Sequence, residues 1–488
     1  MKQKSITLNF IMNAILTMSS FIFPLITFPY VSRVLLPVGT GKVSFATSIV
    51  SYFAMFAQLG IPTYGIRACA KVRDNKEELT RTVQELVIIN FIMSCIAYVV
   101  FAVALFTVPK MAQDKPLFLI ISTTIFFNLI GMEWLYKALE QYTYITMRSI
   151  AFKFLALILM FLFVHEQEDY VIYGAITIVA AVGSNIFNLI NVHKYIFIKP
   201  VGGYDLMRHM KAVSTFLAMS VATTIYTNLD TAMLGFMKGD AEVGYYNAAV
   251  RIKSILVSLV TSLGTVLLPR ASYYVEHGLK DEFLRITKMA LHFVWLIATP
   301  MMLFFIIFAE EGIFFLSGEA YANAILPMQI IMPTLLFIGM SNILGIQMLV
   351  PMGKEKTVLH SEIAGAIVNV IVNALLIPAF GASGAAVGTV IAELVVWLYQ
   401  YVALKDLVKD AYKTMQYWKL ILALIVGSLA SCWVKFIPFG IKTMEVECLI
   451  KLICSAFTFF GAYFVVLLVT KEPFIKDLLD RIFKKIKN

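Results

Sequence analysis

Three basic side chains, Lys153, Arg251 and Lys253, lie inside long apolar stretches of this sequence. Placing a cation in hydrocarbon costs about 2.5–3.5 kcal/mol even on lenient insertion scales, so such residues usually face a wet cavity or an anionic partner. Ammonium and guanidinium groups are also good donors for replacing the hydration of a phosphate. The pattern therefore indicates a path through a membrane for a negatively charged molecule.

The elements that carry these cations are predicted to be membrane helices. The chain has 488 residues, of which 60% are hydrophobic and 14% charged, a composition that soluble proteins of this size do not have. About fourteen apolar runs of about 20 residues or more are long enough to cross a bilayer, so we expect an all-α integral membrane protein. The expected spans are 8–31, 43–61, 83–107, 116–137, 144–164, 171–192, 212–236, 244–268, 286–309, 321–350, 356–377, 382–403, 417–435 and 449–469.

The distribution of basic residues predicts the orientation in the membrane. About three quarters of the 40 lysines and arginines lie on the side that holds both termini. Because basic segments stay in the cytoplasm, we expect cytoplasmic termini and a multi-pass protein of the cytoplasmic (inner) membrane. The formal charge of +10 follows from this topology and does not indicate nucleic-acid binding. No motif for a metal or a cofactor is found, so we expect none.

Two parts of the chain can be aligned without a gap. The segment from Gly41 reads GKVSFATSIVSYFAMFAQLGIPTYGIRA, and the segment from Gly244 reads GYYNAAVRIKSILVSLVTSLGTVLLPRA. Two six-span lobes in the same orientation, related by an axis along the membrane normal, explain this repeat. The expected parts are an N-terminal lobe at 1–205, a C-terminal lobe at 206–404, and two added helices with a basic tail at 405–488.

Polar residues recur at helical spacing on several spans, which predicts faces that line a lumen. A single Ser, Thr or Asn in a membrane helix is usually a contact between helices, whereas an ionisable group at depth is usually functional. We therefore expect functional roles for Lys153, Arg251, Asp230 and Glu393. Lys253 points away from the polar stripe of its helix. The expected polar lumen face consists of Asn247, Ser254, Ser258, Asn369 and Asn373.

Three segments carry a resemblance to a known family. They are FPYVSRVLLPVGTGKVSFA at 28–46, MEWLYKALEQYTYITMRS at 132–149 and TNLDTAMLGFMKGDAEVGYYNAAVRIK at 227–253. The chain resembles the Wzx-type polysaccharide flippases of the multidrug/oligosaccharidyl-lipid/polysaccharide exporter superfamily. The resemblance implies that two lobes move undecaprenyl-diphosphate-linked oligosaccharide units across the membrane by alternating access.

The resemblance also implies roles for individual residues and for partners. It places Arg33, Lys153 and Arg251 along a cationic path. Membrane lipids, a polymerase and other polysaccharide-assembly proteins are implied partners. The product stays open between capsule, O-antigen, exopolysaccharide and a teichoic-type polymer, and the coupling ion and the oligomeric state stay open too. Glu133 and Asp230 lie in the matching segments and are candidate charge partners or coupling residues, and the positions of Glu362 and Glu393 on polar faces of their expected spans add these two carboxylates.

Two other functions fit the sequence less well. A cation-coupled multidrug antiporter of the same superfamily would need carboxylates in its first lobe, yet the first span has none, and buried cations would repel its cargo. A membrane polymerase or glycosyltransferase for lipid-linked sugars would need a sizeable loop for its catalytic residues. The outer loops, such as 165–170 and 238–243, are short. We therefore expect a transporter and not an enzyme.

Overall fold

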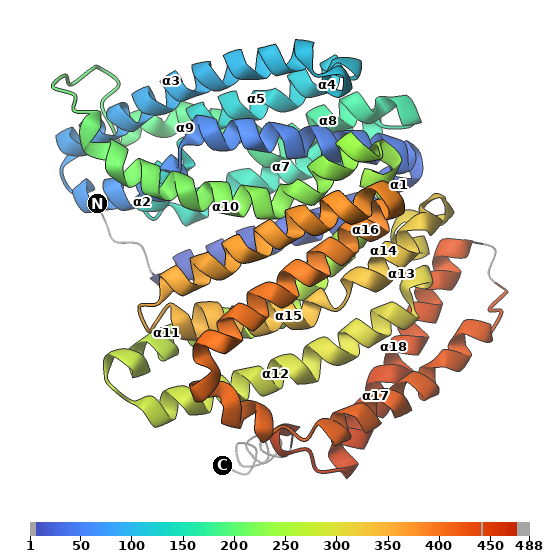
Figure 1. Ribbon diagram of the computed structural model, residues 1–488. Coiled ribbons are helices and arrows are strands. Elements are labelled where there is room, and N and C mark those ends of the chain that lie inside the picture. The colour runs from blue at the N-terminus through green and yellow to red at the C-terminus, as the bar shows by residue number, and fades with distance from the viewer. Residues whose placement is uncertain (1–5, 441–442, 476–488) are drawn as a thin grey trace. The chain divides into compact units, whose positions relative to one another are not determined.

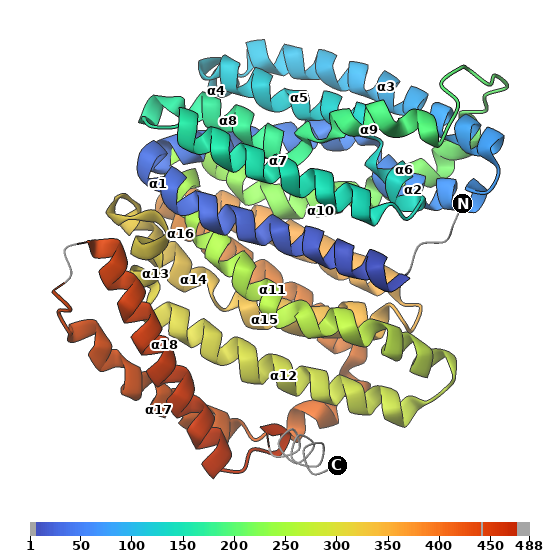
Figure 2. The ribbon, with the colours of Figure 1, turned by 180° about the vertical axis from the view of Figure 1, so that it is seen from behind.

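The computed structural model describes residues 6–440 and 443–475 and is drawn in Figures 1 and 2. Within these residues the chain forms helices and no strands, which confirms the predicted all-α class. The α-helices are α1 Ile6–Gln58, α2 Ile61–Val72, α3 Lys76–Thr107, α4 Pro109–Gln113, α5 Lys115–Gly131, α6 Glu133–Ala138, α7 Tyr142–Phe163, α8 Tyr170–Ile178, α9 Asn185–Asn191, α10 Met207–Met237, α11 Asp240–Glu276, α12 Lys280–Ile307, α13 Ala309–Ser317, α14 Ile325–Ile331, α15 Thr334–Ser341, α16 Glu355–Lys413, α17 Tyr417–Cys432 and α18 Met444–Val469.

Short 3-10 and π segments complete the helical elements. The π segment η2 leads into α9, and the π segment η5 follows α15. π segments often occur at functional sites. Their bounds are η1 Gln167–Asp169, η2 Val179–Gly183, η3 Val192–Lys194, η4 Glu319–Ala324, η5 Asn342–Leu349 and η6 Trp433–Phe436.

Two of the long helices each contain two of the expected spans. Helix α1 is interrupted at Leu36 (φ 58°, ψ 178°), and α16 is interrupted at Gly381 (φ 54°, ψ −129°). A positive φ is unfavourable for leucine, so Leu36 marks a strained turn between the first two spans. At Gly381 the absence of a Cβ makes the turn easy.

The number of spans can be compared with the predicted fourteen only in part. Among the described residues, eight helices are long and apolar enough to cross a membrane, or up to ten if each of two bent helix pairs is one span. This count treats α1 and α16 as single helices. Helix α5 is apolar but shorter. Fourteen spans therefore stay a prediction.

The chain divides into two compact units, Met1–Gly244 and Tyr245–Asn488. In the first unit, α1 packs against α3, α5, α7 and α10. Figure 2 shows α7 beside the N-terminal half of α1. Helix α10, the seventh expected span, thus packs with the first unit. The division into lobes at 1–205 and 206–404 stays a prediction.

In the second unit, α16 packs against α14 and α15, and α17 pairs with α18. The last two helices lie side by side in both views (Figures 1 and 2). An aromatic cluster of Phe304, Phe308 and Phe459 joins α12 to α18. Stacked and edge-on aromatic pairs add to the packing of apolar helices.

Single residues set where helices α2 and α3 of the first unit begin. Helix α2 begins after Gly60, whose φ of 73° suits glycine. Helix α3 begins after Asn75, whose side chain accepts hydrogen bonds from the backbone N–H groups of Glu77 and Glu78, as an N-cap does. Helix α2 packs on α3 and α6, and this packing places Tyr64 beside the start of α10.

Candidate functional site

Lys153 lies on α7 and reaches the N-terminal half of α1. Its Nζ donates to the hydroxyl of Ser19 at 2.7 Å and to that of Ser20 at 3.0 Å. Among the described residues, no carboxylate forms an ion pair with it. Two neutral hydroxyls orient the ammonium group without cancelling its charge, so the group can still attract an anion.

Arg33 lies on α1, three residues before the interruption at Leu36. Its Nη1 donates to the backbone carbonyl of Pro29 at 2.5 Å. The residue is half-buried. Arg33 and Lys153 are thus both in the first unit and both on or against α1.

Glu133 begins α6 and takes part in two ion pairs. Its Oε2 accepts from Arg148 Nη2 at 3.0 Å, and its Oε1 accepts from Lys137 Nζ at 2.8 Å. The Arg148 side chain is only 5% exposed, and its Nη1 also donates to Ser184 Oγ and Asn185 Oδ1. This buried cation was missed from the sequence because it lies near the start of an expected span, where an arginine normally reaches the aqueous side.

Asp230 is buried on α10, where this helix runs along the second half of α1. Next to it, Ser48 Oγ donates to the backbone carbonyl of Asn228 at 2.8 Å and joins the two helices. The buried hydroxyl of Tyr52 makes no hydrogen bond within the described residues. Asp230 therefore lies close to polar groups where α10 packs against α1.

The expected polar stripe of α11 is half-buried along its length, including Asn247 and Arg251. Ser254 Oγ donates to Val250 O and Ser258 Oγ donates to Ile255 O, both within the helix. These hydroxyls satisfy their own donors, so what they can offer a ligand is their lone pairs.

The first half of α16 carries three of the expected polar residues, and they differ in burial. Asn369 and Asn373 are buried, and Asn373 Nδ2 donates to Asn369 Oδ1 at 3.1 Å. Glu362 on the same helix is exposed. Gly388 makes room for the pair, since a Cβ there would lie 2.0 Å from Asn373 Oδ1. The structure therefore brings the two asparagines together and leaves Glu362 apart.

The second half of α16 adds further buried polar groups. Glu393 is 5% exposed and Thr389 is also buried. The hydroxyls of Thr389 and Tyr246 lie 2.9 Å apart and share a hydrogen bond. Tyr246 lies on α11 near the start of the second unit, so this bond joins α11 to α16 within that unit. Tyr246 was not among the expected residues, because tyrosine is common in membrane proteins and its partner is 143 residues away.

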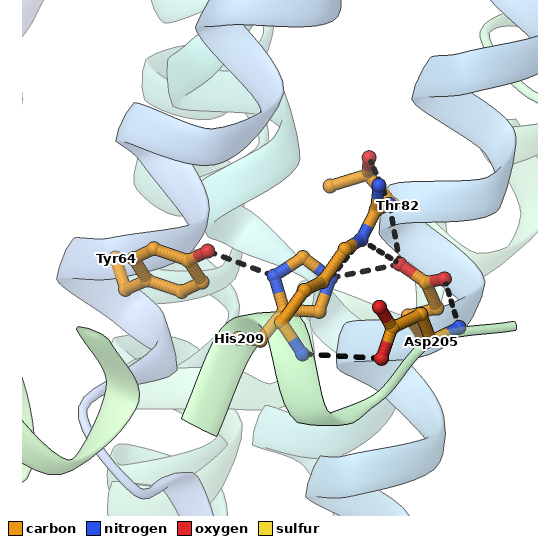
Figure 3. A network of polar contacts seen from close by, with 6 residues as sticks. Tyr64, Thr82, Asp205 and His209 are labelled. Atoms are coloured by element: carbon orange, nitrogen blue, oxygen red, sulfur yellow. Dashed lines mark hydrogen bonds and ion pairs between the residues drawn. The ribbon is translucent and has the colours of Figure 1, made fainter. Parts of the chain in front are cut away.

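A buried network in the first unit was also absent from the sequence-based predictions (Figure 3). The Glu85 side chain is 0% exposed. It accepts from His209 Nε2 at 2.8 Å, from Arg208 Nε at 2.9 Å and Nη2 at 2.5 Å, and from the Asp205 backbone N–H at 2.8 Å. On its other side, His209 Nδ1 lies 2.8 Å from the Tyr64 hydroxyl. The network ties α2 and α3 to the start of α10.

The described residues contain no group of three or more His, Cys, Asp or Glu side chains placed to hold a metal ion. The polar groups of each unit are instead arranged as ion pairs, hydroxyl contacts and amide contacts between helices. Such an arrangement can bind and orient polar groups.

Two models of known protein families match this sequence. A family model described as "Polysaccharide biosynthesis protein" matches residues 6–275, more than half of the chain. The chain belongs to the polysaccharide biosynthesis protein family. A second model, MatE, matches residues 216–375. These matches confirm the resemblance to Wzx-type flippases of the larger exporter superfamily.

Two relatives match about four fifths of this chain and almost their own full lengths. A protein of Escherichia coli (strain K12) described as "Putative O-antigen transporter" is 26% identical over 80% of this chain and 95% of its own. One of Shigella dysenteriae with the same description is 25% identical over 83% of this chain and 100% of its own. The fold matches the solved structure of "Lipid II flippase MurJ, inward closed conformation" with a TM-score of 0.71, at 17% identity, over 96% of this chain and 99% of that one.

Proposed function

We propose that this member of the polysaccharide biosynthesis family is a flippase that carries lipid-linked oligosaccharide units across the membrane for cell-surface polysaccharide assembly. Support comes from two relatives whose descriptions name O-antigen transport and which match over almost their full lengths. The shared fold with a lipid II flippase agrees with this proposal.

The contacts of Lys153 support the proposal that the transported molecule is an anion. Lys153 is held in a membrane helix by two serine hydroxyls and by no carboxylate within the described residues. A diphosphate bridge is a compact anion that cannot cross hydrocarbon alone, and an oriented ammonium group can replace part of its hydration. An uncompensated cation is unfavourable for a cationic drug, which argues against the antiporter.

The finer features of the proposal rest on the resemblance to Wzx-type flippases and on the distribution of basic residues. The polyprenyl carrier is undecaprenyl diphosphate, and its tail stays in lipid while the saccharide passes between two lobes that alternate their access. The protein lies in the cytoplasmic membrane with both termini inside, and a polymerase consumes the transported unit. Arg33 and Arg251 contribute further positive charge along the path.

The proposal is tested with the purified chain in liposomes. A fluorescent oligosaccharide on a polyprenyl diphosphate is the cargo, and a membrane-impermeant lectin reports how much reaches the outer leaflet. Faster exposure than in protein-free liposomes is expected. The same oligosaccharide on an uncharged polyprenyl ether is the control, and it should not be transported. Equal transport of both cargoes would contradict the role of the diphosphate, and no transport of the first would contradict the function.

A further inference from the structure

The segment between η3 and α10, residues 195–206, turns apolar side chains outward. Ile198 is 73% exposed and Met207, just after the segment, is 80% exposed, with Phe197 about half exposed. A connecting loop in water normally exposes polar side chains. This loop joins two membrane helices, so outward apolar groups at this level fit contact with lipid better than contact with water.

The backbone of the same segment is satisfied by side chains of α3. Gln84 Nε2 donates to the carbonyl oxygens of Phe197 at 3.3 Å and Lys199 at 3.0 Å, and Gln84 Oε1 accepts from the Val201 N–H at 3.2 Å. The Phe197 N–H donates to Thr80 Oγ1 at 3.1 Å. A non-helical backbone is tolerated near hydrocarbon only when its polar groups have protein partners. These bonds supply such partners.

The far end of the segment is anchored by the network around Glu85 (Figure 3). The Asp205 N–H donates to Glu85 Oε1, and Arg208 and His209 in the first turn of α10 bind the same carboxylate. The loop is therefore attached to α3 at both ends, and its apolar side chains are presented on a fixed backbone.

An open concavity of about 540 Å³ lies against this loop. That volume is within the range of about 300–1,000 Å³ that ligand clefts occupy. The exposed side chains of His193, Lys194 and Lys199 lie along the same stretch, so the two lysines place positive charge beside apolar surface. The lining residues are Glu77, His193, Ile196, Phe197, Ile198, Lys199, Pro200 and Val201.

We propose that residues 193–201 form a binding site for an anionic phospholipid of the leaflet that the basic residues predict to be cytoplasmic. The acyl chain lies against Phe197 and Ile198, and the headgroup phosphate contacts Lys199 and Lys194. Basic side chains beside apolar surface at a membrane border are typical of sites for anionic lipids. This inference goes beyond the proposed function, since the ligand is a lipid of the bilayer and not the transported cargo.

The first test measures lipid affinity on the full-length purified chain. Phosphatidylglycerol and phosphatidylethanolamine are titrated separately, and bound lipid is counted by native mass spectrometry. The wild type should prefer phosphatidylglycerol. The double variant Lys194→Gln, Lys199→Gln should bind it more weakly, by about fivefold for each lysine removed.

The matched control is Lys405→Gln, Lys409→Gln, which removes two exposed lysines from the end of α16. It changes the net charge equally and should leave the affinity of the site unchanged. Equal weakening by both variants, or no preference of the wild type for phosphatidylglycerol, would overturn the proposal.

The second test asks what touches Ile198. A benzophenone amino acid replaces Ile198, or replaces Asp74 in the turn after α2 as a control, and the full chain is irradiated in vesicles of phosphatidylethanolamine and phosphatidylglycerol. Position 198 should form phospholipid adducts and position 74 should not. Equal labelling, or adducts of position 198 with added polyprenyl lipid in place of phospholipid, would contradict the site. Neither test measures oligosaccharide transport. A negative result would therefore contradict the lipid site without contradicting the proposed flippase function.

Discussion

Gly41 and Gly244 lie where α1 and α11 approach each other through backbone atoms. A Cβ on Gly41 would lie 1.8 Å from the carbonyl oxygen of Asp240, and a Cβ on Gly244 would lie 2.1 Å from that of Pro37. Asp240 and Pro37 each come four residues before the other glycine of the pair. The contact is therefore reciprocal, and it uses the same position in both copies of the sequence repeat.

Alanine at either glycine should lower stability. Gly41→Ala and Gly244→Ala each force two backbones apart, and overpacking of this kind costs about 1–3 kcal/mol. The matched control is Gly461→Ala on α18, where a new Cβ would meet no atom within 4 Å. That change should be neutral or stabilising. Thermal unfolding in detergent measures all three variants, and a loss at Gly461 as large as at Gly41 would contradict the steric explanation.

Lys153→Ala should reduce the transport of the diphosphate cargo strongly without lowering the stability of the fold. The variant removes the ammonium group that Ser19 and Ser20 orient, and taking a cation out of a membrane helix is not costly. Lys153→Arg keeps the charge and should restore part of the rate. The liposome assay measures transport, with Lys211→Ala on the exposed start of α10 as the control. Wild-type transport by Lys153→Ala would remove this residue from the path.

Replacing Arg148 by methionine should destabilise the first unit by about 1–3 kcal/mol, because Ser184 and Asn185 lose a charged hydrogen-bond donor. Glu133 keeps Lys137 as a partner, so its charge is still compensated. A double-mutant cycle with Glu133→Gln should give a coupling energy of about 0.5–3 kcal/mol. Additive losses in thermal unfolding would show that the two residues do not act together.

Glu85→Gln should loosen the attachment of α10 to α3. The carboxylate accepts from Arg208, His209 and the Asp205 N–H, and a neutral amide cannot accept all of these bonds as well. The expected loss of stability is about 1–3 kcal/mol. Glu77→Gln on the same helix is the control, since its pair with Arg81 at 3.9 Å is solvent-exposed and is worth under about 1 kcal/mol. Faster proteolysis within 195–206 in Glu85→Gln alone would agree with this expectation, and equal rates would contradict it.

The helical class, the helix positions and the family of this membrane protein could be predicted from short stretches of its sequence. Whether a segment can cross a bilayer depends on its own length and hydrophobicity, so the helical class and most of the helix positions could be derived. The family resemblance could be recognised from three segments for the same reason, since their residues are contiguous. The unusual placement of Lys153 was evident too, because a lysine within an apolar run contrasts with its immediate neighbours.

The pairing of buried polar groups depends on residues that are distant along the chain. Glu85 meets His209 across 124 positions, and Tyr246 meets Thr389 across 143. No helical spacing indicates such partners, since spacing reports only which residues share a face of one helix. For the same reason, helical spacing does not indicate that Asn369 and Asn373 are buried together while Glu362 on the same helix is exposed.

The sequence by itself therefore determined that the chain is a helical membrane protein of this family with cations at depth, because hydrophobicity and local periodicity control insertion. Only the tertiary structure decided which cations are compensated. Arg148 is held by Glu133, whereas Lys153 is held by two hydroxyls. The physical reason is that the energy of a buried charge depends on the groups that packing brings to it, and packing joins helices that the sequence lists far apart.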